Sequence, residues 1–160
     1  MFIRKYTELT LYCLLVASLI LHRLYGVPNL GLFILLLPLA FLPQESFGLK
    51  SRWNLSLLAL PFLYLLHPYN FFNLAFQAFA EELFFRTYLM QRFSNFTVSI
   101  MFTAPHVILY QDFFSCLTFF PSILYGFVYK KTQSLALVSI LHLSSNLLWF
   151  GFLAPQLQKY

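Results

Sequence analysis

Apolar runs follow one another along almost the whole chain, and only short polar or proline-containing stretches separate them. Hydrophobic residues make up 60% of the 160 residues and charged residues only 9%, whereas a soluble domain carries roughly 25% charged residues. A helix of about 20 apolar residues is long enough to cross a lipid bilayer. The composition therefore predicts an integral membrane protein and excludes an ordinary soluble domain.

Seven apolar segments predict an all-α fold, a polytopic transmembrane helix bundle of about six to seven spans. The segments are residues 6–25, 30–42, 53–66, 70–93, 96–110, 113–129 and 134–153. No pattern of short alternating strands and turns recurs, so a transmembrane β-barrel is not expected. Whether the third segment, which contains Pro61, fully spans the bilayer stays open from the sequence. Residues 1–160 are expected to form a single transmembrane domain.

The basic residues predict an orientation, because cytoplasmic loops carry an excess of Lys and Arg. With seven alternating spans, most of them fall on one side: Arg4, Lys5, Lys50, Arg52, Arg92, Lys130 and Lys131. We expect that side, with the N-terminus, to be cytoplasmic, in a protein of the cell (inner) membrane. The net charge of +5 is attributed to topology and lipid headgroups, and no nucleic-acid partner is expected.

Two adjacent glutamates, Glu81 and Glu82, stand in an apolar segment of a chain with only five acidic residues. Ionised groups are costly in apolar surroundings unless they are paired, which makes such residues functional candidates. On a helix, Arg86 lies one turn beyond Glu82 and can form an ion pair with it. Glu81 points about 100° away from Glu82, so it is the freer carboxylate and the preferred catalytic candidate.

Two further polar sets, His106 alone and His142 with Asn146 one turn later, lie in separate apolar segments. Glu81, His106 and His142 are each 11 residues from a polar residue at the same predicted face, respectively Arg92, Asn95 and Lys131. At 1.5 Å per helical residue, each lies about 16 Å from that face, near the middle of the membrane. The shared depth predicts one assembled site.

The residue types in this site favour hydrolysis. A glutamate opposed to a histidine can orient and deprotonate a water molecule. His142 and Asn146 share one helix face, and both carry hydrogen-bond donors that can stabilise an oxyanion. A catalytic zinc ion held by Glu81, His106 and His142 is not excluded, although no cofactor is expected.

Other interpretations of the same residues remain open. Intramembrane Glu and His residues also suit a proton-coupled transporter, and His106 with His142 also suits a bis-histidine haem protein. The transporter alternative is weakened by the short chain and by the lack of inverted repeats.

Taken in order, the three motifs resemble those of the CPBP family, the CAAX proteases and bacteriocin-processing proteins, also called type II CAAX endopeptidases or the Abi family. The motifs are Glu81-Glu82-Leu83-Phe84-Phe85-Arg86, Phe102-Thr103-Ala104-Pro105-His106 and His142-Leu143-Ser144-Ser145-Asn146. The resemblance covers residues 71–153, the expected catalytic core.

The resemblance implies a glutamic-type intramembrane endopeptidase, although members have often been labelled metalloproteases. By this analogy Glu81 and His106 activate the water, and His142 and Asn146 stabilise the oxyanion. Glu82 forms a supporting ion pair with Arg86 and is a further candidate for the base role.

The implied partner is a membrane protein or peptide with an apolar or lipidated C-terminal tail, bound within the lipid bilayer. The chain is shorter than many members of the family, which puts a true CAAX substrate in doubt. A non-enzymatic membrane protein of the same fold, acting in bacteriocin immunity or as a scaffold, is the alternative.

Overall fold

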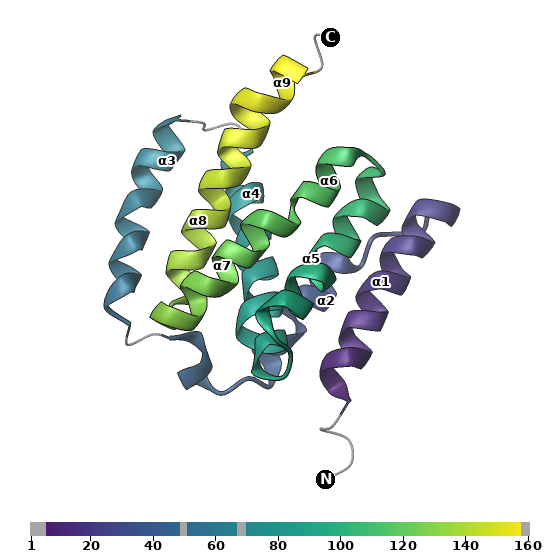
Figure 1. Cartoon of the computed structure of the whole chain (residues 1–160), viewed down its shortest axis with the longest axis horizontal. Helices are drawn as coiled ribbons and strands as arrows, with labels where there is room; N and C mark the ends of the chain where they lie inside the picture. Colours follow the sequence, from purple (N-terminus) through teal and green to yellow (C-terminus); the bar gives the residue numbers. More distant parts are fainter. Residues whose placement is uncertain (1–5, 49–50, 67–69, 158–160) are drawn as a thin grey trace.

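The computed structural model describes residues 6–48, 51–66 and 70–157, and these form helices joined by short turns, with no β-strand among them (Figure 1). The all-α prediction is confirmed. In chain order the elements are α1 (Thr7–Tyr25), α2 (Gly31–Leu36), η2 (Leu37–Ala40), η3 (Gln44–Phe47), η4 (Arg52–Ala59), α3 (Leu60–Leu66), α4 (Phe71–Glu82), η5 (Leu83–Tyr88), η6 (Leu89–Gln91), α5 (Asn95–Tyr110), α6 (Phe113–Leu117), α7 (Phe119–Thr132), α8 (Leu135–Leu148), η7 (Trp149–Leu153) and α9 (Ala154–Leu157).

Three helical stretches among the described residues are long and apolar enough to cross a membrane: Thr7–Tyr25, Phe113–Thr132 and Leu135–Leu153. Large apolar side chains are exposed along these stretches, as expected for a surface in contact with lipid. The remaining helices are shorter or interrupted. The 16 residues of α5, for example, measure about 24 Å against a hydrocarbon core of about 30 Å. The count of six to seven spans therefore stays a prediction.

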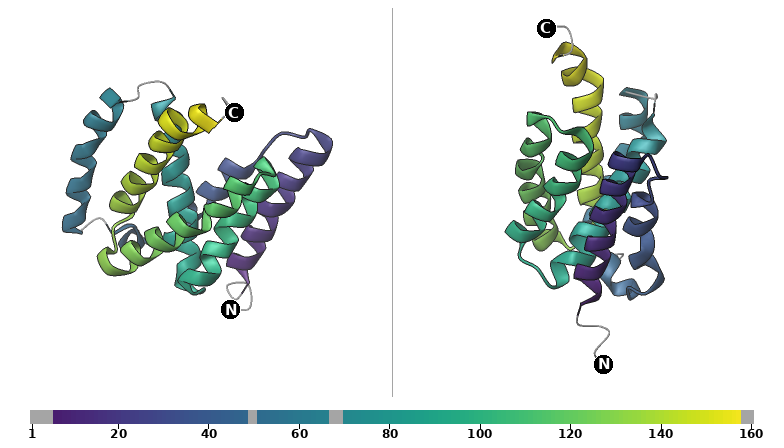
Figure 2. Two further views of the ribbon diagram at one scale, coloured as in Figure 1. Left: turned by 45° about the horizontal axis from the view of Figure 1, so that its top comes forward. Right: turned by 90° about the vertical axis from the view of Figure 1, so that its right-hand side faces the viewer.

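Prolines account for two of the interruptions. The proline ring of Pro121 provides no N–H for the carbonyl of Leu117, and the stretch Phe113–Thr132 divides into α6 and α7 at Thr118 while it stays helical enough to continue as one segment. In the third apolar segment a 3₁₀ helix, η4, changes into α3 at Leu60, next to Pro61. This segment is helical from residue 52 to 66 and packs beside α8 (Figure 2), whereas residue 67 lies outside the described residues.

Two close pairings hold the helices that carry the three motifs. The long segment from α4 through η6 packs most extensively against α8, and α5 packs against α7. The aromatic rings of Phe84 and Phe85 in η5 join Phe102 of α5 and Leu15 of α1 in one buried cluster. These contacts bring α4, α5 and α8 around a common centre, where the polar residues lie.

The start of η4, with Arg52, and the end of α7, with Lys130 and Lys131, lie at one end of the molecule, the lower end in Figure 1, whereas Arg23 is in the last turn of α1, at the other end. Hydrogen bonds join Ser51 Oγ to the Thr132 carbonyl (3.0 Å) and the Tyr129 hydroxyl to the Ser46 carbonyl (3.2 Å). At the same end Arg92 lies 3.6 Å from the carboxylate of Glu8. The shared end agrees with the predicted alternation of the chain, and its cytoplasmic location stays a prediction.

Candidate active site

The two glutamates lie where regular α-helix gives way to a wider turn. The helix α4 ends at Glu82, and η5 continues it as a π-helix whose six residues are all buried. Such π turns are found frequently at functional sites. Arg86 lies inside the turn, so the charged part of the first motif is enclosed by the core of the protein.

The predicted ion pair between Glu82 and Arg86 is confirmed. Arg86 Nε donates to Glu82 Oε2 at 3.0 Å, and both side chains are 0% exposed. The guanidinium also donates through Nη2 to the hydroxyl of Ser122 on α7, at 2.6 Å. Ser122 was missed in the sequence, because a residue 36 positions away carries no spacing signal for this contact.

His142 binds the carboxylate of Glu82 on the oxygen that Arg86 does not contact. Its Nδ1 lies 2.9 Å from Glu82 Oε1. A carboxylate that pairs with an arginine only accepts hydrogen bonds, so Nδ1 carries the hydrogen. The ring stacks on Tyr125 at a centroid distance of 5.2 Å, and its Nε2 is 3.6 Å from Glu81 Oε2. His142 therefore contacts both glutamates.

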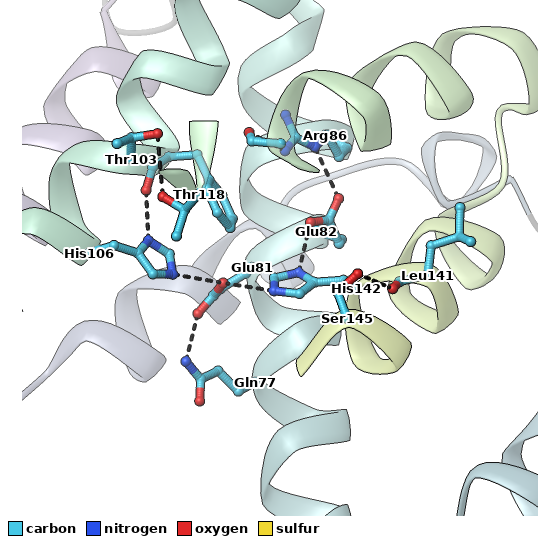
Figure 3. A network of polar contacts seen from close by, with 12 residues as sticks. Gln77, Glu81, Glu82, Arg86, Thr103, His106, Thr118, Leu141, His142 and Ser145 are labelled. Atoms are coloured by element: carbon cyan, nitrogen blue, oxygen red, sulfur yellow. Dashed lines mark hydrogen bonds and ion pairs between the residues drawn. The ribbon is translucent and has the colours of Figure 1, made fainter. Parts of the chain in front are cut away.

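His106 approaches Glu81 from α5. Its Nδ1 donates to the carbonyl of Phe102, one turn earlier, at 2.9 Å. A carbonyl is an acceptor only, so this bond fixes the hydrogen on Nδ1 in the neutral ring. The other nitrogen, Nε2, faces Glu81 Oε2 at 4.0 Å (Figure 3). In this tautomer the lone pair of Nε2 points toward the carboxylate.

The two oxygens of Glu81 have different surroundings. Gln77, one turn earlier on α4, donates through Nε2 to Oε1 at 2.8 Å. Oε2 is buried and has no hydrogen-bond partner within the described part of the chain. The distances from Oε2 to His106 and His142, 4.0 and 3.6 Å, exceed a direct hydrogen bond. Gln77 was also missed in the sequence, although its i, i+4 spacing to Glu81 was a usable signal.

The structure thus brings together four of the five predicted catalytic residues, with Arg86 directly behind them. Those four are Glu81, Glu82, His106 and His142. Asn146 lies one turn beyond His142 on α8 and is half-buried. In the described part of the chain no hydrogen bond joins its side chain to the other four.

A cavity of about 440 Å³ opens beside Glu81. Glu81 and His106 line it, whereas Glu82, Arg86 and His142 do not. Its walls come from α1, α2, α4, η5 and α5 and are mostly apolar; they include Leu15, Leu19, Leu35, Phe76, Phe85 and Leu109. The volume falls in the range of roughly 300–1,000 Å³ typical of ligand pockets. Only one of the two adjacent glutamates is therefore open to a ligand.

The residues that come closest to the arrangement of a metal site are the proposed zinc ligands, Glu81, His106 and His142. Glu81 Oε2 and the Nε2 atoms of His106 and His142 converge, and the Nδ1 atoms of the two histidines donate away from the centre, as in metal-bound histidines. As placed, however, no three His, Cys, Asp or Glu side chains in residues 6–48, 51–66 and 70–157 lie close enough to hold an ion. The absence of a cofactor stays a prediction.

A family model described as type II CAAX prenyl endopeptidase Rce1-like matches residues 63–148 of the chain. The matched stretch covers more than half of the 160 residues, and it contains all three motifs. No curated protein and no solved structure matches the chain.

Proposed function

The chain belongs to the Rce1-like family of type II CAAX prenyl endopeptidases, which are intramembrane proteases, and from this premise we propose a glutamic-type mechanism for it. In this proposal the protein hydrolyses a peptide bond in a membrane-embedded or lipidated substrate tail. The observation that carries it is the position of Glu81 Oε2: buried, without a hydrogen-bond partner in the described residues, and faced by two histidine nitrogens at the wall of a cavity.

Glu81 and His106 activate the hydrolytic water. Glu81 Oε2 and His106 Nε2 are both hydrogen-bond acceptors in the tautomer fixed by Phe102, and they lie 4.0 Å apart. A water between them donates one hydrogen to each and turns its lone pairs toward the cavity. Transfer of a proton to Glu81 as the water attacks gives the tetrahedral intermediate and a neutral carboxylic acid. Glu81 then returns this proton to the peptide nitrogen, the C–N bond breaks, and the amine leaves.

His142 stabilises the negative charge that forms on the carbonyl oxygen. In this proposal His142 acts with a hydrogen on each ring nitrogen: Nδ1 donates to Glu82 Oε1 at 2.9 Å, and Nε2 lies 3.6 Å from Glu81 Oε2. The Nε2 hydrogen is then available to the oxyanion, together with the amide of Asn146 one turn away. Glu82, fixed by Arg86, orients the ring and balances its charge, as the aspartate does in a serine protease triad.

The substrate tail occupies the apolar cavity. Apolar walls favour an apolar or lipidated segment, because burial of each CH₂ contributes about 0.8 kcal/mol. Glu81 and His106 are polar groups in its lining, so a peptide bond held there lies within reach of the activated water.

The test is cleavage of a fluorogenic peptide with a farnesylated cysteine and an apolar C-terminal tail, by the protein in proteoliposomes. Glu81→Gln is expected to lower kcat/KM by about 10²–10⁴-fold, the contribution of a general base. Glu45→Gln is the matched control, because Glu45 is exposed on η3, away from the cavity. Equal rates for Glu81→Gln and wild type would refute the proposal.

A second arm separates the metal-free mechanism from the zinc alternative. Incubation of the wild-type protein with a zinc chelator is expected to leave the cleavage rate unchanged. Loss of activity that added zinc restores would instead assign Glu81, His106 and His142 as metal ligands.

A further inference from the structure

A row of polar side chains runs along the wall of the cavity on α4. Asn73, Gln77 and Glu81 follow one another at intervals of four residues, and all three line the cavity. The side chains of Asn73 and Gln77 are exposed, although the rest of the lining is mostly Leu and Phe. An amide group in apolar surroundings costs free energy unless it finds a hydrogen-bond partner. Gln77 satisfies one of its side-chain N–H groups at Glu81, and the side chain of Asn73 makes no hydrogen bond within the described residues.

The spacing of this row matches the repeat of an extended peptide. Four residues of α-helix advance by about 6 Å, since each residue rises 1.5 Å. Two residues of an extended strand advance by about 6.6 Å, and its main-chain polar groups face the same side at that interval. An extended peptide that lies along α4 therefore presents a main-chain group to Gln77 and another to Asn73.

We propose that Asn73 and Gln77 form an amide ladder that binds the main chain of the substrate in an extended conformation. The inference rests on the proposed function, and it adds the form in which the substrate is recognised. Each amide side chain carries both donors and an acceptor, so it can pair with either N–H or C=O of a peptide bond. The apolar walls accept the side chains, and the ladder positions the next peptide bond at Glu81.

Asn73 and Gln77 have different roles in this arrangement. Gln77 also orients Glu81 through its 2.8 Å hydrogen bond, so Gln77→Leu is expected to raise KM and to lower kcat. Asn73 is one turn farther from Glu81 and acts on binding, so Asn73→Leu is expected to raise KM about threefold to tenfold with little change in kcat.

The experiment measures binding separately from cleavage. A fluorescein-labelled, farnesylated peptide with an apolar tail is titrated with the protein in detergent micelles, and fluorescence anisotropy gives Kd. Every protein carries Glu81→Gln, so that the probe is not consumed. Adding Asn73→Leu is expected to raise Kd about threefold to tenfold, the effect of one lost hydrogen bond. Adding Gln91→Leu, the same kind of change at an exposed amide outside the cavity, is expected to leave Kd unchanged.

A series of probes, each N-methylated at one peptide nitrogen, identifies the main-chain contact. In the protein that keeps Asn73, one of these N-methyl groups is expected to weaken binding about threefold to tenfold. In the Asn73→Leu protein the same N-methyl group is expected to cause no further loss. Equal Kd values with Asn73→Leu and Gln91→Leu would overturn the ladder, and so would a series in which every N-methyl effect persists without Asn73. Because anisotropy does not require cleavage, the two proposals can fail separately. If the Glu81→Gln protein binds the probe through the ladder but the protein with Glu81 intact cleaves nothing, only the proposed function is refuted.

Discussion

The two neighbouring glutamates lie in opposite environments. On the inner side, Glu82 is completely buried, and its oxygens are bound by Arg86 and His142. On the outer side, Glu81 lines a cavity, and its Oε2 has no hydrogen-bond partner in the part of the chain that the structure describes. One rotation of about 100° along α4 separates a fully paired carboxylate from a partly unpaired one.

This difference indicates that the adjacent residues Glu81 and Glu82 have different roles. A buried charge whose partners are all protein groups is held in place and has no contact with a ligand. A glutamate that lines a cavity and has one carboxylate oxygen without a protein partner is placed to act on water or substrate. We therefore expect the inner region to fix the geometry of the site and the outer region to perform the chemistry.

The largest effect on the inner region is expected from Arg86→Met. The change leaves Glu82 charged and buried without its arginine, and removal of one member of a buried pair costs about 3–5 kcal/mol. Chemical unfolding in detergent micelles measures this loss. Arg92→Met is the control, because the Arg92 side chain is 36% exposed and lies 3.6 Å from Glu8, and a partly exposed pair at that distance contributes about 1 kcal/mol. Similar losses of unfolding free energy for Arg86→Met and Arg92→Met would contradict the special role of the buried pair.

In the outer region, His106→Gln is expected to affect activity more than stability. It removes the nitrogen that faces Glu81, and we expect kcat to fall about 10²-fold while the unfolding free energy changes by less than about 1 kcal/mol. Cleavage assays and unfolding curves on the same preparations measure the two effects. His22→Gln, in α1 and away from the cavity, serves as the control. A His106→Gln protein with wild-type kcat would contradict the role of this histidine.

A smaller effect on the inner region is expected from Ser122→Ala. The hydroxyl accepts the 2.6 Å hydrogen bond from Arg86, and its loss leaves a buried guanidinium N–H unsatisfied, at a cost of about 1–3 kcal/mol. Thermal unfolding measures the change. Ser144→Ala is the matched control, since that hydroxyl bonds to the Ile140 carbonyl of its own helix. Equal stability of the two variants would show that Ser122 does not support Arg86.

Much of this organisation follows from spacing along the chain. Apolar runs and prolines predicted the helical segments to within a few residues, and the i, i+4 rule predicted the pair of Glu82 with Arg86. Counting residues from the polar ends predicted that Glu81, His106 and His142 meet, as the distances of 3.6 and 4.0 Å confirm.

Contacts between distant segments could not be predicted in this way. The sequence did not indicate that His142 binds Glu82 through Nδ1, that Ser122 supports Arg86, or that the cavity opens on the Glu81 side. These features depend on how helices rotate about their own axes when they pack. The π turn after Glu82 was also missed, because local spacing patterns do not distinguish it from regular α-helix.

The division of duties between the two glutamates is tested most directly by thermal unfolding of Glu81→Gln and Glu82→Gln in the same detergent. We predict that Glu82→Gln loses about 3 kcal/mol or more of unfolding free energy, because the charge of Arg86 is left buried without its partner. Glu81→Gln should unfold at or above the wild-type temperature, because it removes a charge whose Oε2 has no partner among the described residues. Equal destabilisation of the two variants, or a larger loss for Glu81→Gln, would contradict this division.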